Sequence, residues 1–149
     1  MVARRLPGTA LRVRRGRRRD LPQVERVLGT PPDPRLARVF RRVVADLGAD
    51  LYVAEDDGGE IVGLVSVAYA RSLVRGGVSA WLDGARARRE PVRPVLEGLV
   101  AFAEERARRR GCRRLAAWVD AADAPLRDTL LARGYRAGDL WVTDLAESA

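Results

Sequence analysis

The chain has 149 residues, of which 28 are basic and 20 acidic, giving a net charge of +8, and 47% are hydrophobic. This length and composition exclude a disordered chain and suit one domain, over residues 1–149, whose core needs no disulfide or metal. The absence of histidine and the single cysteine, Cys112, exclude a Ser–His or Cys–His catalytic pair, an internal disulfide and a cysteine-based zinc site, and we expect no metal.

The first predicted elements are a strand and two helices. Residues 11–16 alternate apolar and basic side chains, as an edge strand does. Asp20 is a suitable N-cap for a helix that ends at Gly29, and residues 34–48 carry apolar side chains at helical spacing. The sequence leaves open whether residues 1–10 are ordered.

Three strands are predicted next. The turn at residues 56–59 separates strands over 51–55 and 60–70, in the pattern of a β-hairpin, and a third strand covers 78–83. The near-continuous apolar run of the second strand indicates burial on both faces. The simplest arrangement of the three strands is an antiparallel meander.

The last predicted elements alternate helix and strand. A helix begins at Pro91 or Pro94 and ends at Gly111, and a strand over 112–119 completes a right-handed crossover. A short helix over 124–134 and one or two strands over 135–146 end the chain. The predicted fold class is α+β, a single domain with a mixed, mostly antiparallel sheet flanked by helices.

Membrane and nucleic-acid partners are not favoured by the sequence. No segment approaches the ~18 apolar residues of a membrane span, and the basic N-terminus lacks the apolar core of a secretory signal, so we expect a cytoplasmic protein without membrane contact. All basic residues are arginine, and they are spread along the chain, which favours a solvated surface over a nucleic-acid footprint. Binding of nucleic acid through residues 14–19 and 106–110 remains a third hypothesis.

In order and spacing, these elements resemble those of the GNAT superfamily, the acyl-CoA-dependent N-acyltransferases. The resemblance covers essentially the whole chain. It rests on the opening strand and helix with Asp20 before Leu-Pro, on Gly63 in the hairpin, on the central helix, and on Gly134-Tyr135, where the family has Gly-Phe. It implies the GNAT fold and transfer of an acetyl group from acetyl-CoA to an amine of a small molecule or a protein.

The family's cofactor loop, [RQ]-x-x-G-x-[GA], falls on residues 91–96, where its two glycine positions read Pro94 and Leu96. In the family this loop presents backbone N–H groups to the cofactor pyrophosphate, and proline has none. The donors that remain are the backbone groups of Val95 and Leu96 and the side chains of nearby arginines. The predicted cofactor-binding residues are Arg88, Arg89, Arg93, Val95 and Leu96, with Arg93 the first candidate. Two alternatives stay open: a phosphate site built from side chains, or a loop that does not bind CoA.

Carboxylates are the candidates for a general base, because the chain has no histidine. Asp83 is the first candidate, since the resemblance puts it at the end of the strand that faces the acyl group; Glu55 and Asp120 are weaker ones. Tyr135 is the candidate acid for the leaving thiolate, although it aligns with the family's phenylalanine and core packing competes with this role. The tryptophans are predicted to be core or cleft-lining residues.

A second function class is a catalytically inactive GNAT-fold module for binding or regulation. The missing loop glycines favour it, as does Leu130 at the position where the family's late helix usually has a tyrosine. The acceptor's identity and the oligomeric state, including a homodimer, cannot be read from the sequence.

Overall fold

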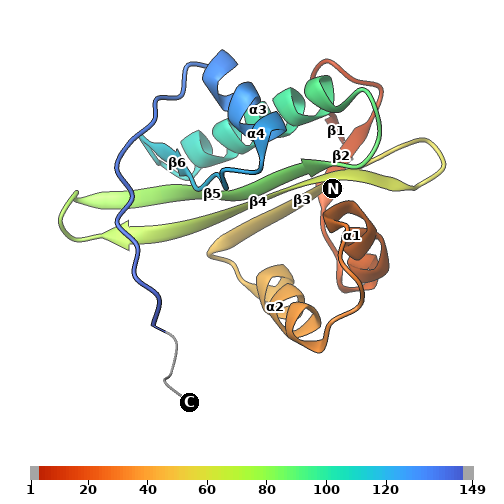
Figure 1. Cartoon of the computed structure of the whole chain (residues 1–149), viewed down its shortest axis with the longest axis horizontal. Coiled ribbons are helices and arrows are strands. Elements are labelled where there is room, and N and C mark those ends of the chain that lie inside the picture. The colour runs from red at the N-terminus through yellow and green to blue at the C-terminus, as the bar shows by residue number, and fades with distance from the viewer. Residues whose placement is uncertain (1–3, 146–149) are drawn as a thin grey trace.

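The computed structural model describes residues 4–145, so residues 1–3 and 146–149 of the predicted domain lie outside the described part. Its centre is a six-stranded sheet in the order β1-β2-β3-β4-β5-β6, antiparallel except for the parallel pair β5 and β6. Helices α3 and α4 lie on one face of the sheet, and α1 and α2 lie on the other (Figure 1). The predicted α+β class and the mixed, mostly antiparallel sheet are confirmed.

The N-terminal half contains four strands. Their bounds are β1 (Arg4–Arg5), β2 (Arg12–Arg15), β3 (Ala49–Glu55) and β4 (Ile61–Ser72). Between β2 and β3 lie a short 3-10 helix, η1 (Arg18–Asp20), and the helices α1 (Leu21–Leu28) and α2 (Pro34–Ala45). The sequence did not predict β1, which adds an edge strand to the sheet.

The C-terminal half follows the predicted crossover. Its elements are β5 (Gly77–Ala87), α3 (Val92–Arg109), β6 (Leu115–Ala117) and α4 (Ala124–Ala132). The hairpin of β4 and β5 extends well beyond the helices at its tip (Figure 1). Strand β6 is shorter than the eight residues predicted, because it is paired with β5 over only three positions.

The prediction of final strands is wrong for the described residues 135–145, which form no strand. This segment is rich in strand-forming side chains, and Leu140, Trp141, Val142 and Leu145 are exposed. Strand propensity reports side chains that suit a pleated surface, and it does not supply a backbone partner. Ala146, the last residue of the predicted strand, lies outside the described part.

Two apolar clusters hold the layers together. The larger one lies between the sheet and the helices α3 and α4, and it includes Leu82, Leu99 and Leu126. The smaller one lies under α1 and α2 and includes Phe40 and Ile61. No helix of the described residues is long and apolar enough to span a membrane.

The N-terminal strand is pressed against α3 at a glycine. Leu6 is fully buried, and a Cβ atom on Gly98 would lie 2.7 Å from the carbonyl oxygen of Pro7 and 2.8 Å from Cγ of Leu6. Only a residue without a side chain permits this approach of two backbones. Gly98 therefore explains how β1 and the loop after it reach the middle of α3.

A buried cluster of charged side chains joins the end of α3 to the sheet. Asp50, which is 1% exposed, accepts hydrogen bonds from Arg15 (3.0 Å) and Arg110 (2.9 Å) at Oδ1. Its Oδ2 accepts one from the Tyr69 hydroxyl (2.8 Å) and lies 3.5 Å from Nε of Arg106. One carboxylate thus pairs with an arginine of β2 and with two arginines at the C-terminal end of α3.

Candidate functional site

The predicted site lies where β5 and β6 part. Parallel pairing covers only Ala80–Leu82 and Leu115–Ala117, and the last contact is the N–H of Trp118 donating to the carbonyl of Leu82 (3.3 Å). From Asp83 to Ala87, β5 continues beside β4 alone. This stretch of β5 therefore has an edge without a strand partner among residues 4–145.

A β-bulge opens that stretch. Ser66 of β4 pairs with Gly84 and Val67 pairs with Leu82, so Asp83 is an extra residue on β5. Leu82 and Ala85 are both buried on the α3 side of the sheet. The bulge therefore turns both Asp83 and Gly84 to the opposite face while the apolar face stays intact.

The bulge also changes which backbone groups of β5 face the open edge. The N–H of Arg88 donates to the carbonyl of Val62 (2.7 Å), so Arg88 and Val62 form a hydrogen-bonded pair. Such pairs alternate along an antiparallel ladder, so Arg86 and Gly84 also bond to β4. Ala85 and Ala87 fall on the other pairs, so their N–H and carbonyl groups point away from β4. An extended ligand with amide groups can bond to this edge as a strand would.

Helix α3 begins beside this edge, and its N-terminus offers few donors. Pro91 is the N-cap and Pro94 is in the first turn, so neither has an N–H, and the N–H of Val92 donates to the Glu90 carboxylate (3.2 Å). The N–H groups of the N-cap and of the first three helical residues, positions 91 to 94, have no acceptor within the helix, and of these only the N–H of Arg93 is free. The backbone at this helix start does not fit a pyrophosphate.

Val95 and Leu96 lie past this first turn. Val92, the first residue of the helix, is four residues before Leu96 and can accept its N–H, and the side chains of both Val95 and Leu96 are buried in the core. Their predicted role as cofactor donors assumed a helix that begins at Pro94, and it stays a prediction. The other predicted start, at Pro91, agrees with the structure.

The three predicted arginines all lie at the helix start, and each one pairs with a carboxylate. Arg88 contacts Glu60 (3.1 Å), Arg89 contacts Asp56 (2.7 Å), and Arg93 contacts Glu97 (3.0 Å). All three arginine side chains are partly exposed, and exposed ion pairs contribute little stability. These guanidinium groups can therefore exchange a carboxylate for a phosphate, so a side-chain phosphate site fits the residues present.

Asp83 is exposed, and its side chain makes no hydrogen bond or ion pair with the described residues. It is thus the one candidate carboxylate at the open edge of β5. Glu55, a weaker candidate, accepts a hydrogen bond from Nε of Arg14 (3.1 Å) and has a structural role. The carbonyl of Asp120 accepts the N–H of Asp123 (2.9 Å) in the turn before α4.

Tyr135 packs against the main core. Its hydroxyl donates to Oε2 of Glu104 (2.8 Å), and Arg133 pairs with Oε1 of the same carboxylate (2.6 Å). Burial and this hydrogen bond raise the pKa of the Tyr135 phenol. The contact ties the segment after α4 to α3, which is a packing role. The role of Tyr135 as the acid for the leaving thiolate stays a prediction.

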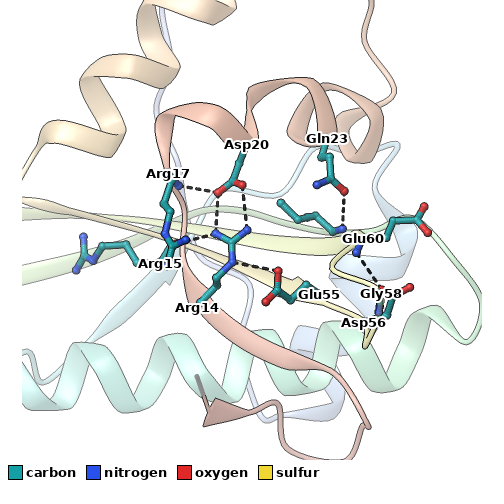
Figure 2. A network of polar contacts seen from close by, with 10 residues as sticks. Arg14, Arg15, Arg17, Asp20, Gln23, Glu55, Asp56, Gly58 and Glu60 are labelled. Atoms are coloured by element: carbon teal, nitrogen blue, oxygen red, sulfur yellow. Dashed lines mark hydrogen bonds and ion pairs between the residues drawn. The ribbon is translucent and has the colours of Figure 1, made fainter. Parts of the chain in front are cut away.

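A polar network fixes the β3–β4 hairpin on the face of α1 (Figure 2). Arg14 lies between Asp20 (2.8 and 2.9 Å) and Glu55, and the Gln23 side chain accepts the N–H of Ile61 (2.7 Å). Burial alone would raise the pKa of Asp20, but hydrogen bonds from Arg14 and Arg17 hold it below its ordinary value. Asp20 precedes α1 as predicted, yet its side chain bonds to Arg14 instead of capping that helix.

The turn between β3 and β4 holds Asp56 and Glu60, the carboxylates that pair with Arg89 and Arg88. Asp56 Oδ1 accepts the N–H groups of Gly58 (3.0 Å) and Glu60 (2.9 Å), while its Oδ2 binds Arg89. A pocket of about 440 Å³ lies over the Arg14 network, away from Asp83, and its lining carboxylates already pair with Arg14. We therefore place the candidate site at the β5 edge and not in this pocket. Residues 4–145 contain no group of carboxylates or cysteine placed to hold a metal ion.

The tryptophans were predicted to be core or cleft-lining residues, and two of them lie outside the core, near Asp83. Trp81 is 42% exposed and Trp118 is 53% exposed, one on β5 and the other directly after β6. Neither position belongs to the core on the α3 side, whereas their neighbours in sequence do. Only the observed bulge and register show that both lie on the face of Asp83.

Comparison with solved structures identifies the architecture. A transcriptional regulator from Bacillus halodurans is 25% identical, with a TM-score of 0.78 over 90% of this chain and 98% of that one. The aminoglycoside antibiotic 6'-N-acetyltransferase AAC(6')-Ih from Acinetobacter baumannii is 14% identical, with a TM-score of 0.74 over 93% and 99%. A GNAT family acetyltransferase from Staphylococcus aureus is 16% identical, with a TM-score of 0.71 over 93% and 100%.

The chain therefore has the GNAT fold, in agreement with the resemblance in its sequence. No protein-family model and no curated protein matches the sequence.

Proposed function

We propose that the protein is a GNAT-type N-acyltransferase that transfers an acetyl group to an amine. The observation that carries this proposal is the open edge of β5 between the bulge at Asp83 and the start of α3. Free backbone donors and an unpaired carboxylate on this stretch of β5, and the arginines at the start of α3, support it. The acetyltransferase names of several structural neighbours support the same reaction class.

The donor we propose is acetyl-CoA, which would supply the acetyl group as a thioester. Arg88, Arg89 and Arg93 would hold its phosphates in place of the backbone donors that the prolines remove. The N–H groups of Ala85 and Ala87 would bond to the amides of its extended arm. In this arrangement the arm leads along β5 toward Asp83.

Asp83 is the proposed general base. The amine nitrogen attacks the thioester carbonyl carbon, the new C–N bond forms, and the C–S bond breaks. Asp83 accepts the proton that the attacking nitrogen loses, and the departing sulfur takes a proton from solvent. No described residue other than Asp83 offers an exposed, unpaired carboxylate on this part of β5.

The alternative is a binding or regulatory module without catalysis. It rests on the same prolines and on Leu130, which is buried in the core and has no catalytic chemistry. The free edge of β5 and the unpaired Asp83 have no explanation in such a module, so we favour the transferase.

Calorimetric titration with acetyl-CoA and with CoA at physiological salt tests the donor. We expect micromolar binding, and no binding at millimolar ligand would contradict the proposal. Release of free thiol in the presence of an amine then tests the reaction. Asp83→Asn should lower kcat/KM about 100-fold, while Asp57→Asn, an exposed carboxylate in the β3–β4 turn, should leave it unchanged.

A further inference from the structure

Three side chains on one face of the sheet surround the point where β5 and β6 part. On the α3 side, Leu82 of β5 belongs to the main core, and Leu115, Ala117 and Val119 pack against it. Side chains alternate between the faces of a strand, so the residues between these core positions point the other way. Those residues are Trp81, Asp83 and Trp118.

The register brings the three close together. Trp81 lies opposite Ala116, and the N–H of Trp118 bonds to the carbonyl of Leu82, directly before Asp83. Strands in a sheet are about 4.8 Å apart, and side chains on one face recur about every 7 Å along a strand. The Asp83 carboxylate therefore lies on the same face as two indole rings, one from β5 and the other from the residue directly after β6.

This part of the face is not covered by the helices. Helix α2 contacts mainly β3, α1 contacts mainly β4, and α1 makes only a minor contact with β5. In Figure 1 both helices lie toward the other end of β4 and β5 from the hairpin tip and from β6. The exposure of Trp81 and Trp118 agrees with this position.

We propose that Trp81, Asp83 and Trp118 form the acceptor site and that it selects an ammonium ion attached to an aromatic or apolar body. This inference rests on the proposed function, because it gives the substrate class of that same site. The faces of the indole rings attract a cation, and the Asp83 carboxylate complements its charge. A neutral or anionic acceptor lacks these contacts.

Asp83 then has a second task besides proton removal. It holds the ammonium group at the bulge, beside the open edge of β5, until that group loses one proton to solvent and becomes the neutral amine; the nitrogen loses its second proton to Asp83 during the attack. The two indoles bind the body of the acceptor and exclude water from one side of it. Trp81 and Trp118 are in this view specificity-determining residues that touch the substrate without taking part in bond changes.

The test uses the full chain without acyl-CoA. The indole N–H resonances of the protein's three tryptophans are followed by NMR during titration with phenethylammonium, and matched titrations use phenethyl alcohol and 3-phenylpropionate. We expect the resonances of Trp81 and Trp118 to shift and saturate, and that of Trp141, which is 92% exposed on the segment after α4, to stay in place. The alcohol should bind about 10-fold more weakly or not at all, and the anion not at all.

Variants separate charge from aromatic contact. Asp83→Asn should reduce affinity for phenethylammonium to that of the alcohol, and Trp81→Ala or Trp118→Ala should each reduce it about 3- to 30-fold. Asp57→Asn and Trp141→Ala are the matched controls and should leave it unchanged. Dispersed NMR spectra check that each variant is folded.

Equal binding of amine and alcohol, or ammonium binding that survives Asp83→Asn, overturns the inference. Shifts confined to Trp141 overturn it as well. Acetyl transfer without this selectivity would leave the proposed function standing and remove only the acceptor site. Selective ammonium binding without any binding of acetyl-CoA would support the ammonium site and contradict the proposed acetyl transfer.

Discussion

At the scale of single residues, Asp50 shows how a buried charge depends on its partners. Burial alone would raise the pKa of its carboxyl, but hydrogen bonds from Tyr69 and Arg110 outweigh burial and hold the pKa below its ordinary value. A carboxyl whose pKa is depressed on folding stabilises the protein above its unfolded-state value of about 3.9. That contribution is lost as the pH falls through the lower folded-state value.

Asp50→Asn should therefore destabilise the protein by about 3 kcal/mol at pH 7, because it leaves buried arginines without their counter-charge. The difference in unfolding free energy between this variant and the parent should begin to shrink below about pH 4, where the carboxyl of the unfolded parent becomes protonated, and should continue to shrink as the pH falls toward the lower folded-state pKa. Urea unfolding at a series of pH values measures this. A difference that stays constant down to pH 3 would contradict the account.

Tyr135 gives a second prediction at this scale. Tyr135→Phe restores the residue type that the GNAT resemblance leads one to expect, and it removes only the hydrogen bond to Glu104. We expect a loss of about 1 kcal/mol in unfolding free energy and unchanged kcat and KM for acyl transfer. A large fall in kcat with unchanged stability would instead support the role of Tyr135 as the acid that protonates the leaving thiolate.

At the scale of elements, α3 is the piece most constrained by its neighbours. Alanine favours helix over glycine by about 1 kcal/mol, so propensity alone predicts that Gly98→Ala stabilises the protein. We expect the opposite, a loss of stability, because the new Cβ would lie 2.7 Å from a backbone oxygen that cannot move without β1. Gly138→Ala, where no atom lies within 4 Å, is the control and should be nearly neutral.

Thermal unfolding of both variants measures this prediction. A rise in Tm for Gly98→Ala would show that β1 gives way easily and that the N-terminal strand contributes little to the fold.

The elements that sequence alone predicts well are those with strong local signals. Apolar spacing and the residues at helix ends predict α1, α2 and α4 to within a few residues, and Pro91 marks the start of α3. The bulge at Asp83 has no such signal, because it arises from the offset between two strands. The prediction of strands over residues 135–145 was wrong for a related reason, because the apolar residues of that segment carry no information about a partner strand.

At the scale of the whole molecule, some of the arginines that dominate the sequence form ion pairs with carboxylates of the same chain. The two basic runs singled out in the sequence meet in the fold, where Arg15, Arg106 and Arg110 all surround Asp50. Arg14 is held by Asp20 and Glu55. The partners lie between 6 and 60 residues apart in the chain, so their pairing could not be read from the sequence.

This pairing predicts weak nucleic-acid binding despite the net charge of +8. We expect a labelled DNA duplex to bind with Kd no tighter than about 10 µM at 150 mM salt, in the range of non-specific binding. Fluorescence anisotropy at several salt concentrations measures this. Submicromolar binding with a steep salt dependence would instead support the nucleic-acid hypothesis.

The bulge at Asp83 has a consequence for how this protein can change over evolution. Replacing Asp83 would alter one side chain, whereas deleting it would remove the bulge and leave the pairs on both sides of it in place, because Leu82 already lies opposite Val67 and Gly84 opposite Ser66. The residues after Asp83 would keep their faces of the sheet, so the core would be unchanged and only the extra carboxylate at the open edge would be lost. A relative that lacks this one residue should therefore keep the fold and lose the proposed reaction.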